Sequence, residues 1–257
     1  MSQRRIYMRS YLMINLVKLL YLIIWCNIFV ASPTIVLSQN NGSNLSAADI
    51  LAAVRTSYGN KTQTFRGQIR PRKVGFKLIP LNITLSDKLI RLEFFESNRS
   101  EKEVDEIIKF EMIDRQYEIT RTKNGISKKL ELPRFNERIR STDLTYEDLA
   151  MRFIEWPRPK LIGVEKAKGG KAWKIRCTNP DTSNGYSFVD AWVSQKSGAL
   201  VRMNGYSAKS QIVKNFEVDS VQQYKGDWYL EMMHVRTFPA DAKSKPTSSY
   251  LKLEIEK

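Results

Sequence analysis

One amphipathic stretch, Thr142–Pro157, interrupts a chain that otherwise has the pattern of strands and one short helix after its leader. Thr145 can cap a helix, and Asp148 three residues later completes the pattern of a capping box. Pro157 and Pro159 predict where the helix ends. A lone amphipathic helix among strands must lay its apolar face against a sheet. The segment therefore either seals a core or covers a hollow.

The apolar face of this predicted helix follows from the spacing of its large side chains. Leu149, Phe153 and Trp156 stand at i, i+4 and i+7, and Tyr146 and Ile154 lie at the edges of the same face. The choice between a sealed core and a covered hollow decides the function, because only a hollow can hold a guest.

Alternation with a period near two begins at Thr62 and predicts about a dozen strands. Before it, residues 46–58 predict a helix with Ser46 as its cap and Asp49 at the box position. A polar, charged connection is expected over residues 97–106. The predicted strands are Phe65–Ile69, Gly75–Leu85, Leu89–Glu96, Ile107–Asp114, Gln116–Thr122, Lys128–Leu132, Lys160–Lys166, Lys171–Thr178, Tyr186–Ser194, Ala199–Tyr206, Gln211–Tyr224, Asp227–Phe238 and Ser248–Glu256.

Short, turn-rich connections such as Lys123-Asn124-Gly125 join these strands, which indicates an antiparallel arrangement. Two helices are too few to cover a large flat sheet, but they can fill the concave side of a curled one. We therefore predict a mainly β (α+β) fold: a single large curved antiparallel sheet, or unclosed β-barrel, with two helices lidding the concave face.

Residues 1–38 have the pattern of an export signal, with basic residues between positions 4 and 18 and an apolar run over Leu19–Val30. Val36-Leu37-Ser38 predicts cleavage before Gln39, which leaves residues 39–257 as the folded domain. The alternative is an uncleaved membrane anchor, since Leu19–Leu37 nearly reaches the length of a span.

The formal net charge of +15 favours anionic partners such as an anionic membrane surface. The charges alternate along strands, as in Lys171–Arg176, so we interpret them as a solvated basic face. No RNA- or DNA-binding signature is present, and we expect no nucleic-acid partner.

Catalytic chemistry finds little support in the sequence. No nucleophile elbow, phosphate-binding glycine loop or zinc-protease motif occurs. Glu147 and Asp148 are adjacent at a predicted helix start, where acids interact favourably with the helix dipole. Cys177 is expected to be a small buried side chain and His234 a packed histidine. We expect no enzyme, no cofactor and no metal site, with an enzyme acting on envelope glycans or lipids as the least favoured alternative.

Aromatic residues and methionines recur on the predicted strands of the second half. Such side chains line adaptable apolar pockets, but they also simply fill cores, and the sequence leaves both open. The residues concerned are Trp173, Phe188, Trp192, Met203, Phe216, Trp228, Met232 and Met233.

Three motifs in this half of the chain stand out together. They are Thr142–Leu149 followed by Phe153 and Trp156-Pro157, the strand–turn–strand segment Ala191–Tyr206, and Gly226-Asp227-Trp228. This set resembles the mid-chain signature and the strand–turn–strand pattern of bacterial outer-membrane lipoprotein-sorting proteins of the LolA-like superfamily. The resemblance is clearest over residues 140–240.

The resemblance implies an unclosed antiparallel β-barrel whose helices cover an apolar cavity, and binding of lipoprotein acyl chains in the periplasm. It implies a monomeric carrier without covalent chemistry. An envelope-stress sensor or other interaction protein on the same scaffold is the alternative. An interior filled by the chain's own side chains, with no room for a guest, would overturn the carrier interpretation. The residues expected to line the cavity are Tyr146, Leu149, Phe153, Trp156, Trp173, Trp192, Trp228 and Met232.

Overall fold

The computed structural model of the protein describes residues 45–57, 62–72, 75, 77–86, 88–96, 103–113, 116–181, 185–224, 227–241 and 243–255. The chain divides into two units, Met1–Gln39 and Asn40–Lys257, and every described residue belongs to the second. The export signal expected over residues 1–38 lies outside the described residues and stays a prediction. No helix among the described residues is both long enough and apolar enough to cross a membrane.

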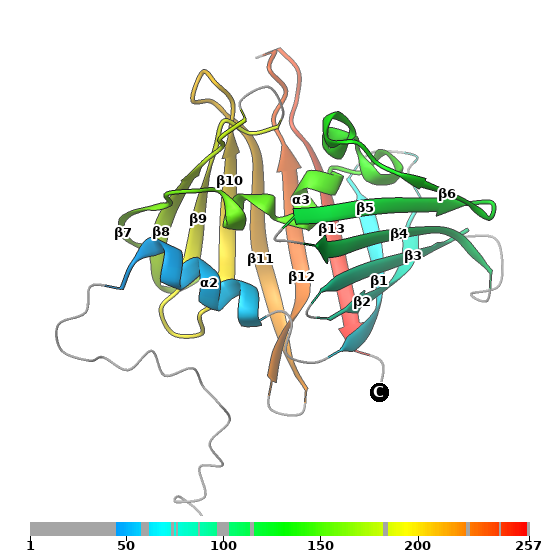
Figure 1. Ribbon diagram of the computed structural model, residues 1–257, viewed down its shortest axis with the longest axis horizontal. Coiled ribbons are helices and arrows are strands. Elements are labelled where there is room, and N and C mark those ends of the chain that lie inside the picture. The colour runs from blue at the N-terminus through cyan, green and yellow to red at the C-terminus, as the bar shows by residue number, and fades with distance from the viewer. Residues whose placement is uncertain are drawn as a thin grey trace, which may run out of the picture. The chain divides into compact units, whose positions relative to one another are not determined.

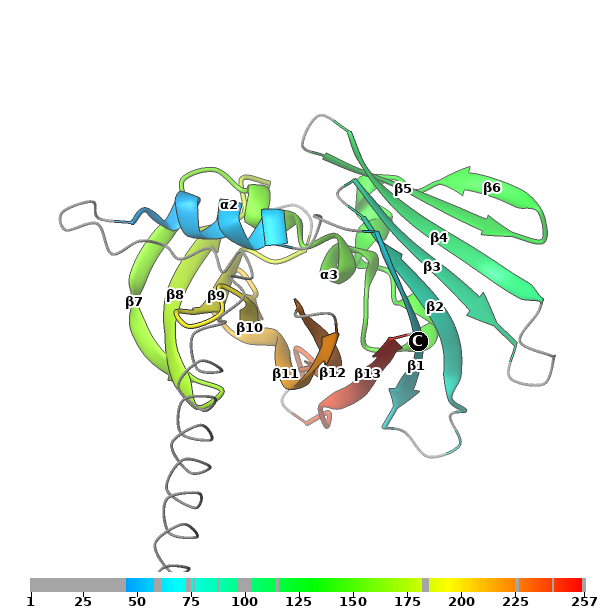
Figure 2. The ribbon, with the colours of Figure 1, turned by 90° about the horizontal axis from the view of Figure 1, so that it is seen from below.

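Within the described residues, thirteen antiparallel strands form one curled sheet whose two edge strands do not pair, which confirms the predicted fold class (Figure 2). Most strand bounds fall within one to three residues of the predicted ones. The strands are β1 (Gln63–Pro71), β2 (Ile79–Leu85), β3 (Leu89–Phe95), β4 (Val104–Ile113), β5 (Gln116–Lys123), β6 (Ile126–Lys129), β7 (Lys160–Ala167), β8 (Gly170–Thr178), β9 (Phe188–Ser194), β10 (Leu200–Tyr206), β11 (Ile212–Tyr224), β12 (Asp227–Thr237) and β13 (Thr247–Ile255).

The strands form two meanders, β1–β6 and β7–β13, which join where β1 pairs with β13. Ile69 of β1 lies opposite Leu251 of β13, so the first and last strands of the domain are neighbours in the middle of the sheet. As a consequence β6 and β7, which are consecutive in the chain, form the two opposite edges. The connection between them, residues 130–159, has to cross the sheet, and we call it the strap.

Two helices lie on the same side of the curled sheet, across its open side (Figures 1 and 2). The first, α2 (Ala47–Ser57), begins as predicted, because Ser46 and Asp49 exchange hydrogen bonds of 3.2 Å between backbone and side chain. Its Ile50, Leu51 and Val54 are fully buried against the sheet. Burying each such side chain contributes about 1.5–3 kcal/mol, which fixes α2 to the concave face.

The prediction of one continuous helix up to Trp156 was wrong. The helix α3 covers only Tyr146–Ala150 and ends at Met151, which has a left-handed conformation with φ 45°. A separate 3₁₀ turn, η3 (Arg152–Glu155), follows. The predicted capping box is present. Phe153 and Trp156 are buried as predicted, but they follow a break in the helix and do not share one continuous helical face with Tyr146.

The polar connection predicted over residues 97–106 is shorter than expected, because β4 already begins at Val104. Asp105 and Glu106 can occupy this strand because arginines neutralise them: Arg140 pairs with both carboxylates, and Arg121 donates to Glu106. A charge pattern that favours a loop was therefore outweighed by ion pairs formed with distant residues, which the local sequence does not reveal.

One continuous apolar core occupies the concave side of the sheet and extends from α2 to β5. It combines inward-facing residues of nearly every strand with the undersides of α2 and the strap. Its largest fully buried members are Phe65, Phe94, Phe110, Ile50, Leu51, Ile69, Leu81, Leu92, Ile108, Ile119, Ile139 and Leu144. The main core lies on the concave side, and only a small separate cluster of buried residues, around Trp192, lies on the convex face of the described strands.

Candidate functional site: the strap over the concave face

The strap runs from the β6 edge to the β7 edge and is attached to successive strands on its way (Figure 1). It contains η1 (Leu132–Asn136), η2 (Ile139–Ser141), α3 and η3. Polar side chains attach it to β4, β13 and β11 in that order, and Arg55 of α2 attaches its far end. It is therefore a cover held at four points.

The first attachment joins the strap to β4 and β5. The Arg140 side chain donates to Glu106 Oε2 at 2.8 Å and to Asp105, and its guanidinium lies 4.9 Å from the centre of the Phe94 ring. Glu106 is buried and also accepts a hydrogen bond from Arg121. Charge-assisted contacts of this kind position two elements strongly, because each carboxylate is neutralised by a fixed partner.

The second attachment joins the strap to β13. The buried carboxylate of Asp143 accepts hydrogen bonds from Ser249 Oγ at 2.8 Å and from the Thr247 hydroxyl. In return the backbone N–H of Asp143 donates to Ser249 Oγ at 3.0 Å. Arg138 stands 3.9 Å from the same carboxylate. These contacts satisfy a buried charge that would otherwise be costly.

The third attachment is a buried ion pair between α3 and β11. Lys214 Nζ donates to Asp148 Oδ2 at 2.7 Å and to the backbone carbonyl of Asp143 at 2.6 Å. Asp148 also accepts from the backbone N–H of Thr145 at 2.8 Å and from the Tyr186 hydroxyl. Both charged side chains are buried, and the surrounding donors satisfy them.

Tyr186 can reach this ion pair because Gly205 lies beside its ring. A Cβ at position 205 would overlap the ring carbons of Tyr186, so only glycine fits this place on β10. Burial, together with the negative charge of Asp148, raises the pKa of Tyr186 well above its ordinary value. Tyr186 therefore acts as a hydrogen-bond donor to the carboxylate over the whole physiological pH range.

The fourth attachment joins the strap to α2. Arg55 Nε stands 2.5 Å from Glu155 Oε1 of η3, and this pair is partly exposed. Within the strap, Arg152 donates to Glu147 at 2.7 Å and its guanidinium lies 5.3 Å from the Phe135 ring centre. Burial raises the pKa of Glu147, while Arg152 counteracts the shift.

Backbone strain is concentrated in the strap. Of the seven described non-glycine residues with a positive φ, four lie in the strap: Arg140, Ser141, Met151 and Arg158. Left-handed conformations of such residues cost on the order of 1 kcal/mol each and persist only where surrounding contacts enforce them. The four attachments supply those contacts, so the strap is held in a conformation that it does not favour by itself.

Five of the eight predicted site residues contribute to the main core, and four of them are part of the strap. Tyr146, Phe153 and Trp156 are buried members of the core, and Leu149 and Trp173 pack against it while partly exposed. Tyr146 lies with its ring centre 6.4 Å from that of Phe110 of β4. That these residues line a cavity stays a prediction.

The other three predicted site residues lie elsewhere. Trp192 belongs to a separate small cluster with Ala167 and Ala172 on the outer face, where its indole N–H donates to Glu165 at 2.9 Å. Met232 pairs with Lys252 on the outer side of β12. Trp228 lies near the end of the β11–β12 hairpin with 64% of its surface exposed. Alternation along a strand places a side chain on one face or the other, and the sequence pattern alone did not reveal which.

The interior beneath α2 and the strap is occupied by the chain's own side chains. Residues from both covers and from the strands form a single packed cluster, and many of its members have almost no exposed surface. A guest of any size therefore has to displace one of the covers. The expected hollow is therefore absent among the described residues, and this result counts against a carrier that keeps an open cavity.

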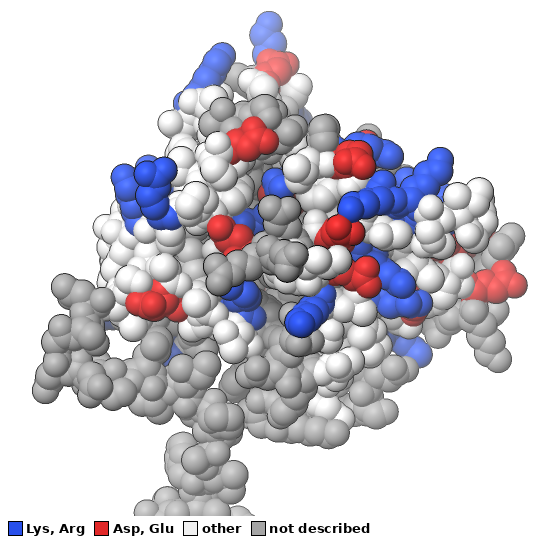
Figure 3. All heavy atoms as spheres, in the orientation of Figure 1, with Lys and Arg blue, Asp and Glu red and all other residues white. Residues whose placement is uncertain are grey.

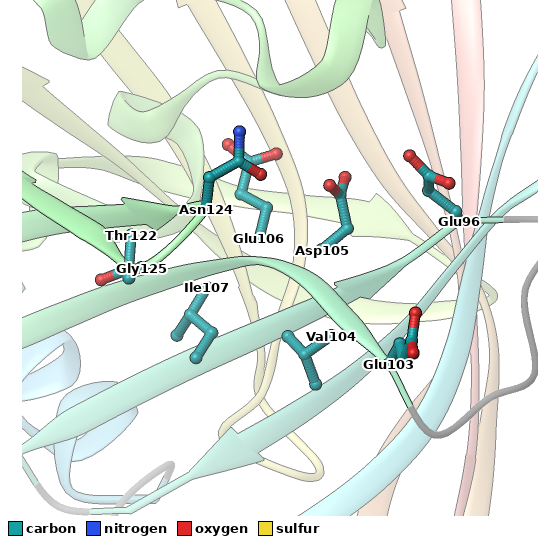
Figure 4. A pocket seen from close by; sticks show the side chains of 9 residues that line it. All are labelled: Glu96, Glu103, Val104, Asp105, Glu106, Ile107, Thr122, Asn124 and Gly125. Carbon is teal, nitrogen blue, oxygen red and sulfur yellow. The ribbon is translucent and has the colours of Figure 1, made fainter.

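A separate pocket of about 480 Å³ lies at the end of β4 and is not the predicted apolar cavity (Figure 4). Four carboxylates and two aliphatic side chains contribute to its lining, so it does not offer the apolar surface that an acyl chain needs. The lining residues are Glu96, Glu103, Val104, Asp105, Glu106, Ile107, Thr122, Asn124 and Gly125.

The expected isolated residues and surface charges can also be compared with the structure. Cys177 is buried, and burial raises the pKa of its thiol to about 12. His234 is buried on β12, where its ring stacks on Tyr250 with centroids 4.3 Å apart. Among the described residues, no group of three potential ligands is arranged to hold a metal ion. Basic and acidic side chains are interspersed on the face shown in Figure 3.

Sequence reasoning missed Lys214, Tyr186 and Ser249, which hold the strap in place. Lys214 stands at an inward-facing position between Ile212 and Phe216 of β11, so a lysine among alternating apolar residues was the available signal. Tyr186 and Ser249 carried no such signal, because tyrosine and serine are ordinary residues at strand ends.

The fold and its covered concave face define a class of protein: an unclosed antiparallel barrel whose apolar inner surface is covered by short helices of the same chain. A family profile described as an uncharacterized protein matches residues 129–256, which include the strap and β7–β13. No curated protein matches the chain.

Three solved structures share this fold. A DUF1329 family protein from Desulfovibrio piger has a TM-score of 0.66 at 13% identity, with 80% of this chain and 89% of that chain covered. An outer membrane lipoprotein-sorting protein domain from Vibrio parahaemolyticus, so described in its structure, has a TM-score of 0.65 at 14% identity, with 80% of this chain and 91% of that chain covered. A LolA superfamily protein from Nitrosomonas europaea has a TM-score of 0.60 at 15% identity, with 82% of this chain and 92% of that chain covered. At these identities the likeness shows that the chain shares the fold of these three proteins.

Proposed function

We propose that the protein binds the acyl chains of lipid-modified proteins between its concave sheet face and its helical covers, and carries them across the periplasm in lipoprotein sorting. The observation that carries the proposal is the composition of the covered face. An apolar surface on both halves of the sheet is closed by α2 and the strap, which are short segments of the same chain. The role needs no covalent chemistry.

The free energy of exposing an acyl chain to water explains why a carrier of lipid-modified proteins needs a shielded binding site. Burying an acyl chain is worth about 0.8 kcal/mol per CH₂, so a long chain in water requires shielding on the order of 10 kcal/mol. The core beneath α2 offers apolar contacts of comparable quality, and displacing Ile50, Leu51 and Val54 exposes them to a guest. Binding therefore exchanges contacts with α2 for contacts with the acyl chain, and the strap stays in place through its polar attachments.

The filled interior favours a second candidate function, a protein-interaction scaffold that acts through its surface and binds no lipid. In the carrier proposal, the same filled interior means that a cover has to move before an acyl chain can enter. The two candidates differ in one measurable property, which is uptake of an apolar guest by the delipidated protein.

The experiment measures binding of a fluorescent sixteen-carbon fatty acid to the delipidated domain, residues 39–257. Wild type is compared with Val54→Ala, which weakens the core contact of the cover expected to move, and with Ala52→Ser, on the exposed side of the same helix. Saturable uptake by wild type, faster in Val54→Ala and unchanged in Ala52→Ser, supports the carrier. Absence of uptake in all three proteins refutes it and leaves the interaction scaffold.

The location of the protein is tested separately. Mass spectrometry of protein purified gently from its native envelope identifies the mature amino terminus and any retained acyl species. Cleavage before Gln39 with a retained acylated protein is the expected result. An intact leader would place the domain on a membrane anchor instead.

A further inference from the structure

The two edges of the sheet differ in the way they are protected. The β6 edge is only four residues long and carries Lys128 and Lys129, and Lys129 is paired with Glu118 at 2.8 Å. Short length and lysines are devices that prevent an edge strand from pairing with another chain. The β7 edge is twice as long, with eight residues, and its lysines, Lys160 and Lys166, stand near its ends while aliphatic side chains occupy its middle.

The aliphatic side chains of β7 are unusually accessible. Leu161, Ile162 and Val164 are exposed over 43%, 49% and 53% of their surface, although they follow one another along one strand. In the register with β8, Leu161 lies opposite Ile175 and Val164 opposite Trp173. Both partners pack in the main core, so this patch continues the apolar concave face to the uncovered rim of the sheet.

The backbone of β7 is available for pairing over its regular part. Of the described strands, β7 pairs with β8 alone, and as the terminal strand of the sheet it directs alternate N–H and C=O groups outward. The register shifts between Leu161 and Gly163, so the regular run extends from Gly163 to Ala167. An extended segment can add to such an edge through main-chain hydrogen bonds, with side-chain contacts providing specificity.

The charge around this edge indicates the chemistry of its partner. Arg158, Lys160 and Lys166 are exposed, and none forms an ion pair with another described residue. The acid on the strand, Glu165, is already engaged by Lys174 at 3.0 Å and by the Trp192 indole. Two copies of this edge would bring six cations together, whereas an acidic segment would bring negative charge to a positively charged edge.

We propose that β7 is a docking edge for an extended polypeptide segment that alternates aliphatic and acidic residues, which it binds as a fourteenth strand. The aliphatic side chains of the segment lie against Leu161 and Val164 on the concave side. Its acids point to the other face, where Lys160 lies, while Lys166 stands on the face of Val164 near the end of the strand. The proposal does not rest on acyl-chain binding, because the edge is accessible while the interior is filled.

The test uses a fluorescein-labelled ten-residue peptide that alternates valine and glutamate, with a peptide alternating valine and lysine as its control. Binding to the delipidated domain is followed by fluorescence anisotropy, and the binding site is located by amide hydrogen exchange. Val164→Ser and Lys160→Glu alter the β7 edge, and Ile126→Ser and Lys128→Glu make the matched changes on the β6 edge. All four side chains are exposed, so the fold is retained.

The expected result is binding of the glutamate peptide with slowed exchange over residues 160–167. Affinity falls at least tenfold for the lysine peptide, Val164→Ser and Lys160→Glu, and stays unchanged for the two β6 variants. Equal loss on both edges, or protection elsewhere, overturns the proposal. A dimer in sedimentation that Val164→Ser abolishes assigns the edge to a second copy, and binding to phosphatidylglycerol vesicles that Val164→Ser abolishes assigns it to a membrane; either result also overturns it.

Discussion

The helices α2 and α3 cover the same concave face but are attached to it by different forces. α2 presents Ile50, Leu51 and Val54 to the core, whereas α3 brings the buried carboxylate of Asp148 to the buried ammonium of Lys214. Apolar contact is not directional and tolerates a change of partner. A hydrogen-bonded ion pair fixes position, and breaking it leaves a charge without compensation.

This difference indicates which cover can move. A guest made of hydrocarbon can replace the apolar contacts of α2 at little net loss, because it offers the same kind of surface. It cannot replace the ammonium group that neutralises Asp148. We therefore expect α2 to be displaced when an acyl chain enters, while α3 and the strap keep their place as the fixed wall of the site.

Removing the cation beneath α3 gives the largest expected effect. Lys214→Met keeps most of the side-chain volume but leaves Asp148 buried without its positive partner, which lowers the free energy of unfolding by about 3–5 kcal/mol. Urea denaturation at pH 7 measures the change. Lys252→Met, at the exposed pair with Glu254, serves as the control and should leave stability unchanged. Similar stability of the two variants would show that α3 is held by its apolar face, as α2 is.

Truncating a core side chain of α2 is expected to lower stability less than Lys214→Met does, and to speed the entry of a fatty acid into the core. Val54→Ala removes buried hydrocarbon worth about 2 kcal/mol, at ~0.8 kcal/mol per CH₂ plus a cavity term. The variant should also take up the fluorescent fatty acid faster than wild type. Ala52→Ser, on the exposed side of the same helix, is the matched control. Uptake that is unaffected by Val54→Ala would indicate that α2 is not the moving cover.

Removing the Tyr186 hydroxyl tests how much its hydrogen bond to Asp148 contributes to stability and to the pH dependence of stability. Tyr186→Phe removes one donor to Asp148 and should lower the free energy of unfolding at pH 7 by about 1.5 kcal/mol, because two other donors to this carboxylate remain. Since the pKa of Tyr186 is raised in the folded protein, the unfolded chain loses this proton first as the pH rises. Wild-type stability therefore falls above pH about 10, the ordinary pKa of tyrosine.

The pH dependence of the variant completes this test. Tyr186→Phe should lose stability less steeply above pH about 10 than wild type, because it has one fewer raised tyrosine. Burial also raises the pKa of Tyr117 and Tyr146, so part of the alkaline decrease remains. Unfolding by urea between pH 7 and pH 11 measures both curves. Parallel curves would show that Tyr186 contributes nothing to the pH dependence.

The contrast between α2 and α3 also explains how far the sequence could be interpreted. Periodicity and turn residues predicted nearly all strands, because each depends on neighbours along the chain. The cap of α3 was predictable for the same reason. Its early end at Met151 was not, since a left-handed methionine is stable only where the strap must follow the sheet.

The site was less predictable than the fold because its key contacts join distant residues. Asp148 meets Lys214 across 66 positions of the chain, and Asp143 meets Ser249 across 106. No local pattern encodes such pairs, and without them Asp148 could be interpreted only as a helix cap. The face of each strand that Trp192 and Trp228 occupy was likewise set by pairing registers that one sequence does not show.

The smallest expected effect concerns Trp228, which the sequence grouped with the residues beneath the covers. Because it is largely exposed at the β11–β12 hairpin, Trp228→Ser should change the free energy of unfolding by less than about 0.5 kcal/mol and leave fatty-acid uptake unchanged. Trp156→Ser, which alters a buried tryptophan of the strap, is the comparison and should lower stability strongly. If Trp228→Ser abolished uptake while Trp156→Ser retained it, the guest would bind at the hairpin, and the difference between the two covers would have no bearing on function.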